Sequence, residues 1–498
     1  MRHEACGVRA LAAAAALFGV LSFAQTAAAQ TPGLPVVPIL GDPLGGSVSP
    51  FEGSIAVPQP IRGVPEPPRH PFMAPNGRSN IHNDAYMTDT YRVGGPLGDG
   101  AETSSLFARE CASVTFDSQG RIVTICVGLD RPVLALLDPH TLATLAAMPL
   151  PIRNPLSGSN PFTDFSGGGY FYLDNHDRAV LPTNDRHLLE VAVTAGPSFT
   201  VTRDYDLSGA VQVDDGIVSV LPDWSGRFWF VSRHGIVGTV DRASGVIHTL
   251  GLPGEGISNS FAVDETGGVF IVSDRALYRF DAGPDGGPQV SWREVYPNSG
   301  IHKPGQSDAG SGTTPTLMGP DWVAITDNAD PMDVIVYRRG RSVTGSRLVC
   351  SEPVFRPGAS ATDQSLIGTD RALIAENNYG YSGISATMNG GVTEPGLTRV
   401  DVRNGRCSTI WTSDERAPSV VPKLSLSNGL VYTYTKPPRG DNVDAWYLTT
   451  LDFRTGRTVY RRLAGTGFGH NNHYAPVTLG PDGRAYVGVL GGIVAFTP

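Results

Sequence analysis

The sequence predicts an all-β fold, a single β-propeller of eight four-stranded blades, and three observations lead to this prediction. The 498 residues include 60 Gly and 40 Pro, which interrupt every stretch long enough to form a sizeable helix. Short apolar runs of β type recur along the chain, each with a turn of the form Asp-x-x-Gly-Arg or a close relative. The copies return about every 50 residues, a period typical of four-stranded propeller blades.

The repeat has eight copies. They read FDSQGRIVTICV (116–127), LDNHDRAVLPT (173–183), LPDWSGRFWFVS (221–232), VDETGGVFIVS (263–273), MGPDWVAIT (318–326), IGTDRALIAE (367–376), LSNGLVYTYT (426–435) and LGPDGRAYVGV (479–489). Most copies precede another strand and a second turn signal, so each unit is expected to hold antiparallel strands A to D, with the A–B and C–D turns at one end. A seven-bladed ring is the structural rival, if the copy at 318 or 426 is a loop insertion.

The last unit supplies only three strands before the chain ends at Pro498. We expect its fourth strand to come from residues 85–93 (AYMTDTYRV), just upstream of the first blade. Closing the ring in this way would pair the two ends of the chain and remove an open sheet edge. The propeller domain is therefore predicted to span residues 84–498.

Two segments precede the propeller. Residues 1–29 have the order of a secretory signal peptide, with Arg2 and Arg9 ahead of an apolar run at 10–23 and then small residues. That run is shorter than the roughly 20 residues that a membrane span needs. Residues 30–83 are rich in proline and are expected to form an extended arm, partly polyproline II, that acts as a linker or lies on the body. The mature protein is expected in the periplasm or outside the cell.

Four cysteines remain after the predicted cleavage site, an even number for an oxidising compartment. Cys111 and Cys126 are symmetric about the turn at 117–120, so they face each other in a regular hairpin and are expected to form a disulfide. No register argument applies to Cys350 and Cys407, which are left unpaired or uncertain. No cysteine lies in a C-x-x-C motif or at zinc-finger spacing, so a structural zinc site is not expected.

The charge balance limits the classes of partner. The chain has 38 basic and 47 acidic residues, a net charge of -9, and no basic footprint for nucleic acid or an anionic membrane. Only 17% of residues are charged and 40% are hydrophobic, which suits a well-buried globular body. A small polar or carbohydrate-like ligand, or another protein, is the expected partner.

Two stretches resemble blades of known propeller families. ISNSFAVDETGGVFIVSD (257–274) resembles a blade of the SMP-30/gluconolactonase/strictosidine-synthase-like propellers, and DFRTGRTVY (452–460) resembles YVTN and PQQ-type repeats. The first resemblance implies a divalent metal held near the axis by Asn, Asp and Glu. Asn259 matches such an asparagine, but blade 1 has no matching Glu. The second implies PQQ against a disulfide of adjacent cysteines and a tryptophan; only Trp411 has a repeat-like position and no adjacent cysteine pair exists, so PQQ is not expected.

Polar residues gather at the predicted inner strands of three consecutive blades. Five residues before the A–B turns of blades 4, 5 and 6 stand Asn259, Thr314 and Asp363. The B–C loops of blades 5 and 6 add further oxygen donors, namely Asp327, Asn328, Asp330, Glu376, Asn377 and Asn378. Ca²⁺ prefers such ligands, so we predict a cation at Asn259, Asp363, Asp327 and Asp330, with Thr314, Glu376, Asn377 and Asn378 binding substrate. The alternative is that these side chains only cap turns.

Histidines supply the predicted acid–base chemistry. His470 and His473 flank Asn471 and Asn472 in the loop that enters the final blade, and His302 lies in the long loop before blade 5. Imidazoles move protons near neutral pH, so these three histidines are the candidate catalytic residues, with Asn472 as a substrate contact. The alternative is that each is a hydrogen-bonded loop residue.

Two function classes follow for the B–C and D–A face, where these loops are expected to meet. The first is an exported lyase or hydrolase that acts on a small polar or carbohydrate-like substrate. The second is a binding or scaffolding propeller that presents loops to a protein or a glycan. A quinoprotein-like oxidoreductase is a third, weaker alternative. The chain contains no G-x-S-x-G, H-E-x-x-H or Gly-rich phosphate loop, which argues against a serine hydrolase or a nucleotide enzyme.

Overall fold

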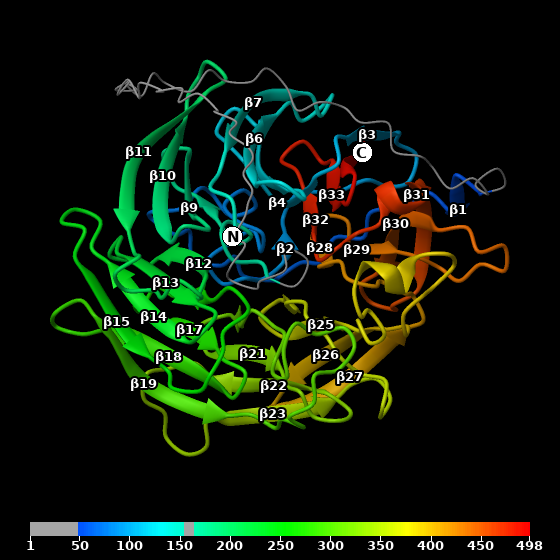
Figure 1. Ribbon diagram of the computed structural model, residues 1–498. Helices are drawn as coiled ribbons and strands as arrows, with labels where there is room; N and C mark the ends of the chain where they lie inside the picture. Colours follow the sequence, from blue (N-terminus) through cyan, green and yellow to red (C-terminus); the bar gives the residue numbers. More distant parts are fainter. Residues whose placement is uncertain (1–47, 154–163) are drawn as a thin grey trace, which may run out of the picture.

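Eight β-sheets form a closed ring in the computed structural model, which describes residues 48–153 and 164–498 (Figure 1). Each predicted repeat copy provides strands of one blade, so the weak copies at 318 and 426 are blades 5 and 7, and the ring has eight blades rather than seven. Neighbouring strands within each four-stranded blade are antiparallel.

The blades follow one another in chain order, with the innermost strand first. Blade 1 holds β4 (Glu110–Phe116), β5 (Ile122–Val127), β6 (Val133–Leu137) and β7 (Thr144–Pro149); blade 2 holds β8 (Tyr172–Leu173), β9 (Arg178–Pro182), β10 (His187–Val193) and β11 (Phe199–Asp206); blade 3 holds β12 (Ile217–Pro222), β13 (Phe228–Ser232), β14 (Ile236–Val240) and β15 (Ile247–Gly251); blade 4 holds β16 (Ala262–Val263), β17 (Val269–Val272), β18 (Ala276–Ala282) and β19 (Pro288–Val295).

The second half of the ring has the same order. Blade 5 holds β20 (Thr316–Met318), β21 (Trp322–Thr326), β22 (Asp333–Arg338) and β23 (Leu348–Pro353); blade 6 holds β24 (Ile367–Gly368), β25 (Ala372–Glu376), β26 (Leu397–Arg403) and β27 (Arg406–Ser413); blade 7 holds β28 (Lys423–Ser425), β29 (Leu430–Thr435), β30 (Ala445–Asp452) and β31 (Thr458–Thr466); blade 8 holds β32 (Val477–Leu479), β33 (Ala485–Val489) and β34 (Gly492–Phe496). Two 3₁₀ turns, η2 (Ile384–Thr387) and η3 (Phe468–His470), lie in the described loops.

The repeated turn motif has a physical basis in its aspartate. In the first copy, Oδ1 of Asp117 accepts hydrogen bonds from the backbone N–H groups of Gln119 and Arg121, and Oδ2 accepts one from Nε of Arg121 at 2.7 Å. Gly120 has φ of 77°, a left-handed conformation that favours glycine. The side chains of the motif therefore satisfy the turn's backbone and fix the register of the A–B hairpin.

An N-terminal strand closes the ring, but the segment that we expected is the wrong one. Strand β3 (Glu102–Leu106), not residues 85–93, pairs with β34 as the outermost strand of blade 8. The β3 side chains are half-buried or exposed, as suits an outer strand. Residues 85–93 instead carry buried polar groups, Thr88 and Asp89 among them, and lie at the centre of the ring.

The segment 78–91, here called the plug, follows the inner rim of the ring. Its backbone carbonyls accept hydrogen bonds from the N–H groups of innermost strands in blades 1, 2, 4, 5, 6 and 7, with the pairs Phe116 to Arg78, Leu173 to Ser79, Val263 to Ala85, Leu317 to Tyr86, Gly368 to Thr88, Leu424 to Asp89 and Leu426 to Tyr91. Within it, β2 (Thr90–Tyr91) pairs in parallel with β28. The plug thus occupies the position where a propeller has its axial channel.

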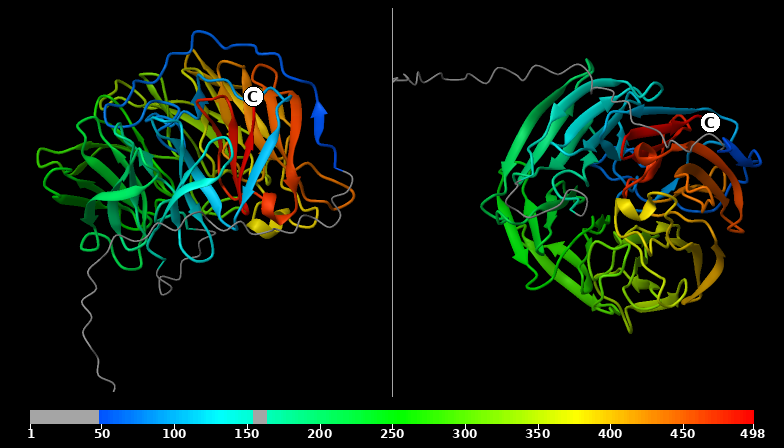
Figure 2. Two further views of the ribbon diagram at one scale, coloured as in Figure 1. Left: turned by 90° about the horizontal axis from the view of Figure 1, so that it is seen from above. Right: turned by 45° about the vertical axis from the view of Figure 1, so that its right-hand side comes forward.

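The proline-rich arm crosses one face of the ring. Its first strand, β1 (Phe51–Gly53), adds to the outer edge of blade 7 by pairing with β31. Residues 54–72, here called the strap, then cross the face that carries the A–B turns (Figure 2). The strap is tied at blade 7, where the backbone N–H of Ile61 donates to the carbonyl of Leu426 at 2.8 Å, and at blade 2, where Nδ2 of Asn175 donates to the carbonyl of Pro71 at 2.8 Å.

Two disulfides reinforce the blades. Cys111 and Cys126 are directly opposed on β4 and β5 and form the predicted bond. Cys350 and Cys407, which the sequence left open, also pair, and their bond joins the outer strands β23 and β27 of neighbouring blades. The core lies between the blades, where apolar side chains of facing sheets pack together. In the described ranges no helix has the length and apolar character needed to cross a bilayer.

Candidate functional site

An axial cavity of about 40 Å³ brings together several of the predicted site residues. Asn259, Thr314, Asp363 and His473 all line it. Ala112 and Gly169, which stand at the equivalent position of blades 1 and 2, line it as well, so counting back from the A–B turns did identify residues near the axis. His473 and Asp363 therefore share one pocket, and their roles in binding or catalysis stay predictions.

Asp363 is the carboxylic acid that lines this cavity. Burial raises the pKa of its carboxyl to about 7, and the nearby Asp308 adds to the effect. The backbone N–H and the hydroxyl of Ser307 donate to the carboxylate at 3.2 and 3.3 Å and oppose the rise in part. Oδ1 of Asn378 accepts the backbone N–H of Asp363 at 3.0 Å, so Asn378 positions this residue. Asp363 can hold or release a proton near neutral pH.

His82 of the plug forms another part of the cavity wall. Its Nδ1 lies 3.1 Å from Oδ1 of Asp89, and the same carboxylate is paired with Lys423 and accepts the Ser365 hydroxyl. All four groups are buried. Nε2 of His82 is buried and has no hydrogen-bond partner in the part of the chain that the structure describes. Burial lowers the pKa of His82 and so favours the neutral form of its imidazole.

His473 is held in place by the elements around it. Its Nδ1 lies 2.8 Å from the hydroxyl of Tyr381, and its backbone N–H donates to Oε1 of Glu110 at 2.8 Å. Burial raises the pKa of Glu110 to about 8, so this carboxyl is largely protonated at neutral pH. The ring of Tyr474 stands 4.8 Å from the ring of His473. A loop histidine at this position is thus fixed against the cavity by hydrogen bonds and ring contacts.

The other predicted catalytic histidines do not line the axial cavity. Nδ1 of His470 lies 3.1 Å from the carbonyl of Thr466, and burial lowers the pKa of this imidazole. Nε2 of His302 lies 2.5 Å from the carbonyl of Gln306. Both contacts are those of hydrogen-bonded loop histidines.

The predicted substrate contacts of blades 6 and 8 serve the fold around the cavity. Glu376 is fully buried and accepts Nδ2 of Asn378 at 2.9 Å, and burial raises its pKa well above the usual value. Asn377 donates to the carbonyls of residue 359, in the connection from blade 5, and residue 395, in the loop before β26. Asn472 donates to the carbonyls of Ala475 and Gly488, both at 2.8 Å. None of Glu376, Asn377, Asn378 and Asn472 lines the cavity.

The four predicted calcium ligands do not meet in one place. Asn259 and Asp363 line the axial cavity, whereas Asp327 and Asp330 do not. Asp327 accepts the backbone N–H groups of Ala329 and Asp333, and Asp330 accepts that of Gly358. Across residues 48–153 and 164–498 no three His, Cys, Asp or Glu side chains gather closely enough to hold a metal ion. Calcium binding stays a prediction.

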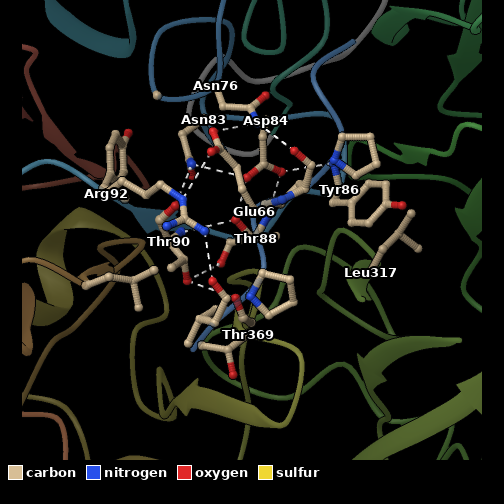
Figure 3. A pocket seen from close by; sticks show the side chains of 18 of the residues that line it. Glu66, Asn76, Asn83, Asp84, Tyr86, Thr88, Thr90, Arg92, Leu317 and Thr369 are labelled. Carbon is tan, nitrogen blue, oxygen red and sulfur yellow. Dashed lines mark hydrogen bonds and ion pairs between the residues drawn. The ribbon is translucent and has the colours of Figure 1, made fainter. Parts of the chain in front are cut away.

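A larger cavity, of about 610 Å³, lies under the strap (Figure 3). Its floor is the plug, its rim is formed by A–B turns of blades 4, 5, 6 and 8, and its cover is the strap from Val64 to Pro68. We call this cavity the chamber. The plug contributes side chains to both cavities, with His82 at the axial cavity and Asp84 at the chamber.

The polar groups of the chamber are mostly tied to one another, as Figure 3 shows. The carboxylate of Asp84 accepts the Thr88 hydroxyl and Nδ2 of Asn83, and burial raises its pKa to about 7. Nε of Arg92 lies 3.2 Å from a Glu66 carboxylate oxygen, and its guanidinium also donates to the carbonyl of Val64. Arg92, the residue that directly follows the plug, therefore connects this end of the plug to the strap.

Sequence reasoning missed the chamber because it assigned any site to the opposite face. The A–B turns contain ordinary turn residues, and nothing in them indicates a ligand. Two signals could have directed attention there. The proline-rich arm is long enough to cover a face of the ring, and the run NDAYMTD (83–89) is too polar for the buried position that it occupies.

Comparison with known proteins supports the architecture. No family model matches the chain. A curated relative, an uncharacterised protein of Archaeoglobus fulgidus, is 28% identical over 313 residues, which cover 56% of this chain and 60% of the relative's own length. Among solved structures, quinohemoprotein alcohol dehydrogenase from Comamonas testosteroni is similar with a TM-score of 0.55 at 12% identity, over 86% of this chain and 80% of that chain. That likeness extends to the fold alone.

A streptogramin B lyase structure is also similar, with a TM-score of 0.39 at 11% identity, over 78% of this chain and 93% of that chain. At this TM-score the likeness is too weak to support a comparison of sites. The residues present do not fit the quinone site that the PQQ-type resemblance implies. Trp411 lies on the outer strand β27, where its Nε1 donates to the carbonyl of Phe453, and neither disulfide joins adjacent cysteines.

Proposed function

We propose that this protein binds a small organic molecule in the chamber between the strap and the ring. The volume of the two cavities carries the proposal. Small-molecule sites in proteins have volumes of roughly 300–1,000 Å³, and the chamber, at about 610 Å³, falls within that range. The axial cavity, at about 40 Å³, has room for little more than a water molecule or two.

The construction of the chamber supports the same conclusion. Six prolines and three leucines line it together with a few polar side chains, which is the usual composition of a small-molecule site. Its cover is proline-rich, and between Ile61 and Pro71 this segment has no regular hydrogen bonding to a sheet. The cover can therefore move without breaking a blade. The plug beneath it is anchored to six blades and provides a rigid floor.

A filling substitution tests the proposal. Val64 lines the chamber from the strap, and Val57 is 77% exposed on the same strap and does not line it. Val64→Trp should reduce or abolish binding, whereas Val57→Trp should leave binding unchanged. The probes are phenylacetate, phenethylammonium, octanoate and benzyl alcohol, measured by saturation-transfer NMR on the full chain. Binding of no probe to the wild type, or equal binding to Val64→Trp, would contradict the proposal.

A second candidate is acid–base chemistry at the axial cavity, as in a lyase or hydrolase that acts on a small polar or carbohydrate-like substrate. The observation that favours it is that Asp363, with its pKa of about 7, and His473 line the same cavity. Asp363 would donate a proton to the substrate or accept one from it, and His473 would exchange protons with the same reacting group. Only the reacting group of a substrate fits a cavity of about 40 Å³.

Activity measurements separate this candidate from simple binding. Chromogenic glycosides and simple lactones serve as probes, with Asp363→Asn and His473→Gln as test variants. The exposed Asp214 is a matched control, because Asp214→Asn changes the same charge away from either cavity. Loss of turnover in the two cavity variants alone is the expected result for an enzyme. Equal turnover in all three variants would exclude this role for Asp363 and His473.

We further propose export to the periplasm or the outside of the cell. Two disulfides support this compartment, since disulfides persist in oxidising environments. The predicted signal peptide, residues 1–29, lies outside the described residues. Intact-mass measurement of the protein purified from its own cell fractions tests the proposal. The expected species begins at Gln30 and is absent from the cytoplasm, and a full-length cytoplasmic species would contradict it.

A further inference from the structure

The chamber contains one arginine, Arg78, whose backbone is fixed and whose guanidinium has no opposite charge paired with it in the described residues. The backbone of Arg78 is held on both sides, since its N–H donates to the carbonyl of Pro75 at 3.0 Å and its carbonyl accepts the N–H of Phe116 at 3.2 Å. The half-buried side chain lines the chamber. Its guanidinium makes no hydrogen bond or ion pair with any residue in 48–153 or 164–498.

The other charged groups of the chamber contrast with Arg78. The strap carboxylate of Glu66 is paired with Arg92 at 3.2 Å. Glu265, at the A–B turn of blade 4, is paired with Arg339 at 3.0 Å. Each of these charges has an opposite charge beside it, so neither needs a ligand.

Two further acidic side chains, Asp370 and Asp84, line the chamber and could repel a bound anion. Asp370 lies at the rim, and the guanidinium of Arg371 stands 3.4 Å from its carboxylate. Asp84 is buried in the floor, where a hydroxyl, an amide and two backbone N–H groups donate to its carboxylate. Because burial raises the pKa of this carboxyl to about 7, it carries only part of a full negative charge at neutral pH.

We infer that the chamber takes an organic carboxylate with an apolar body. Arg78 would bind the carboxylate, because a guanidinium fits a carboxylate with two parallel hydrogen bonds. The proline rings and leucine side chains of the wall would contact the apolar body. This inference rests on the proposed function and adds the ligand class to it.

A charge series on one carbon skeleton tests the ligand class. The probes are phenylacetate, phenylacetamide and phenethylammonium, with octanoate, octanamide and octylammonium as a second series, titrated into the full chain by calorimetry. The carboxylates should bind about tenfold more tightly than the amides, the size expected for hydrogen bonds to a charged group. Increasing salt should weaken the carboxylates and leave the amides unchanged.

The matched variants are Arg78→Gln and Arg275→Gln. Arg275 is exposed and outside the chamber, so its substitution controls for the loss of one positive charge. Arg78→Gln should remove the preference for carboxylate over amide, and Arg275→Gln should keep it. If inorganic phosphate binds as tightly as octanoate in the same titration, the inferred apolar body is wrong.

The outcomes separate this inference from the proposed function. Equal affinity for carboxylate, amide and ammonium, with all three lost in Val64→Trp, would refute the ligand class and leave the chamber as a binding site. If Val64→Trp keeps carboxylate binding and Arg78→Gln loses it, Arg78 binds the carboxylate outside the space of the chamber. That result would refute the ligand class inferred for the chamber and the proposed function as well.

Discussion

Replacing Asp363 by asparagine should make the protein more stable at alkaline pH and leave it unchanged at acidic pH. Asp363 is 8% exposed, and burial raises the pKa of its carboxyl from 3.8 to about 7 in the folded protein. The folded state therefore binds more protons than the unfolded state between these two values. The stability that this group contributes is complete below pH 4 and is lost as the pH rises through 7.

The size of the effect follows from the same two values. At about 1.4 kcal/mol per pKa unit, a rise from 3.8 to about 7 corresponds to roughly 4 kcal/mol of unfolding free energy, a ceiling because the carboxyl can gain water when it ionises. Asparagine resembles the protonated acid and cannot ionise. The difference in unfolding free energy, Asp363→Asn minus wild type, should therefore rise between pH 4 and pH 8 and stay constant above that.

Urea unfolding at a series of pH values measures this difference. Asp214→Asn, at an exposed position, should give a difference that does not change with pH. A flat profile for Asp363→Asn would show that the carboxyl is ionised without cost, and the cavity would then be open to bulk water. A profile that falls between pH 4 and pH 8 would show that the folded protein stabilises the carboxylate, which would reverse the sign of our reasoning.

Three further results are expected. Arg92→Gln should speed tryptic cleavage of the strap about two- to fivefold, because exposed ion pairs such as Arg92–Glu66 contribute roughly 0–1 kcal/mol. An unchanged cleavage rate would mean that Arg92 does not hold the strap. Lys423→Met should lower the unfolding free energy by about 3–5 kcal/mol, since it leaves the buried Asp89 carboxylate without its cation. The double variant Lys423→Met, Asp89→Asn should be more stable than Lys423→Met alone. Replacing both Cys350 and Cys407 by serine should cost about 4 kcal/mol, as expected for a 57-residue separation, and should show no loss if the two thiols are free in solution.

The blades could be predicted from sequence because their information is local. In blades 1 to 4 the aspartate of the A–B turn, such as Asp117, accepts hydrogen bonds from backbone N–H groups two and four residues further along, so the pattern is visible in a short window. Strand alternation and the repeat period then determine the ring. Asn259 and Asp363 were placed near the axis by counting along equivalent strands, which uses the same periodicity.

The plug, the strap and the second disulfide could not be predicted in this way. The plug resembles a strand in its sequence, but Asp89 finds its cation at Lys423, 334 residues further along the chain. The Cys350–Cys407 bond depends on how two blades sit side by side, which no single repeat reveals. The chamber exists only because the strap and the A–B turns face each other across it.

The position of the plug has a consequence for the order of folding. Residues 78–91 leave the ribosome before any blade, yet most of their hydrogen-bond partners lie between Val263 and Leu426, and the partner of β3 is β34 at the end of the chain. During synthesis most of the plug and all of β3 lack their partners until many later residues have emerged. The first blades can form their hairpins as they appear, but the centre of the molecule and its closing sheet can be completed only after the last residues are made. A chain stopped short of blade 8 would therefore lose a blade and also leave β3 without a partner.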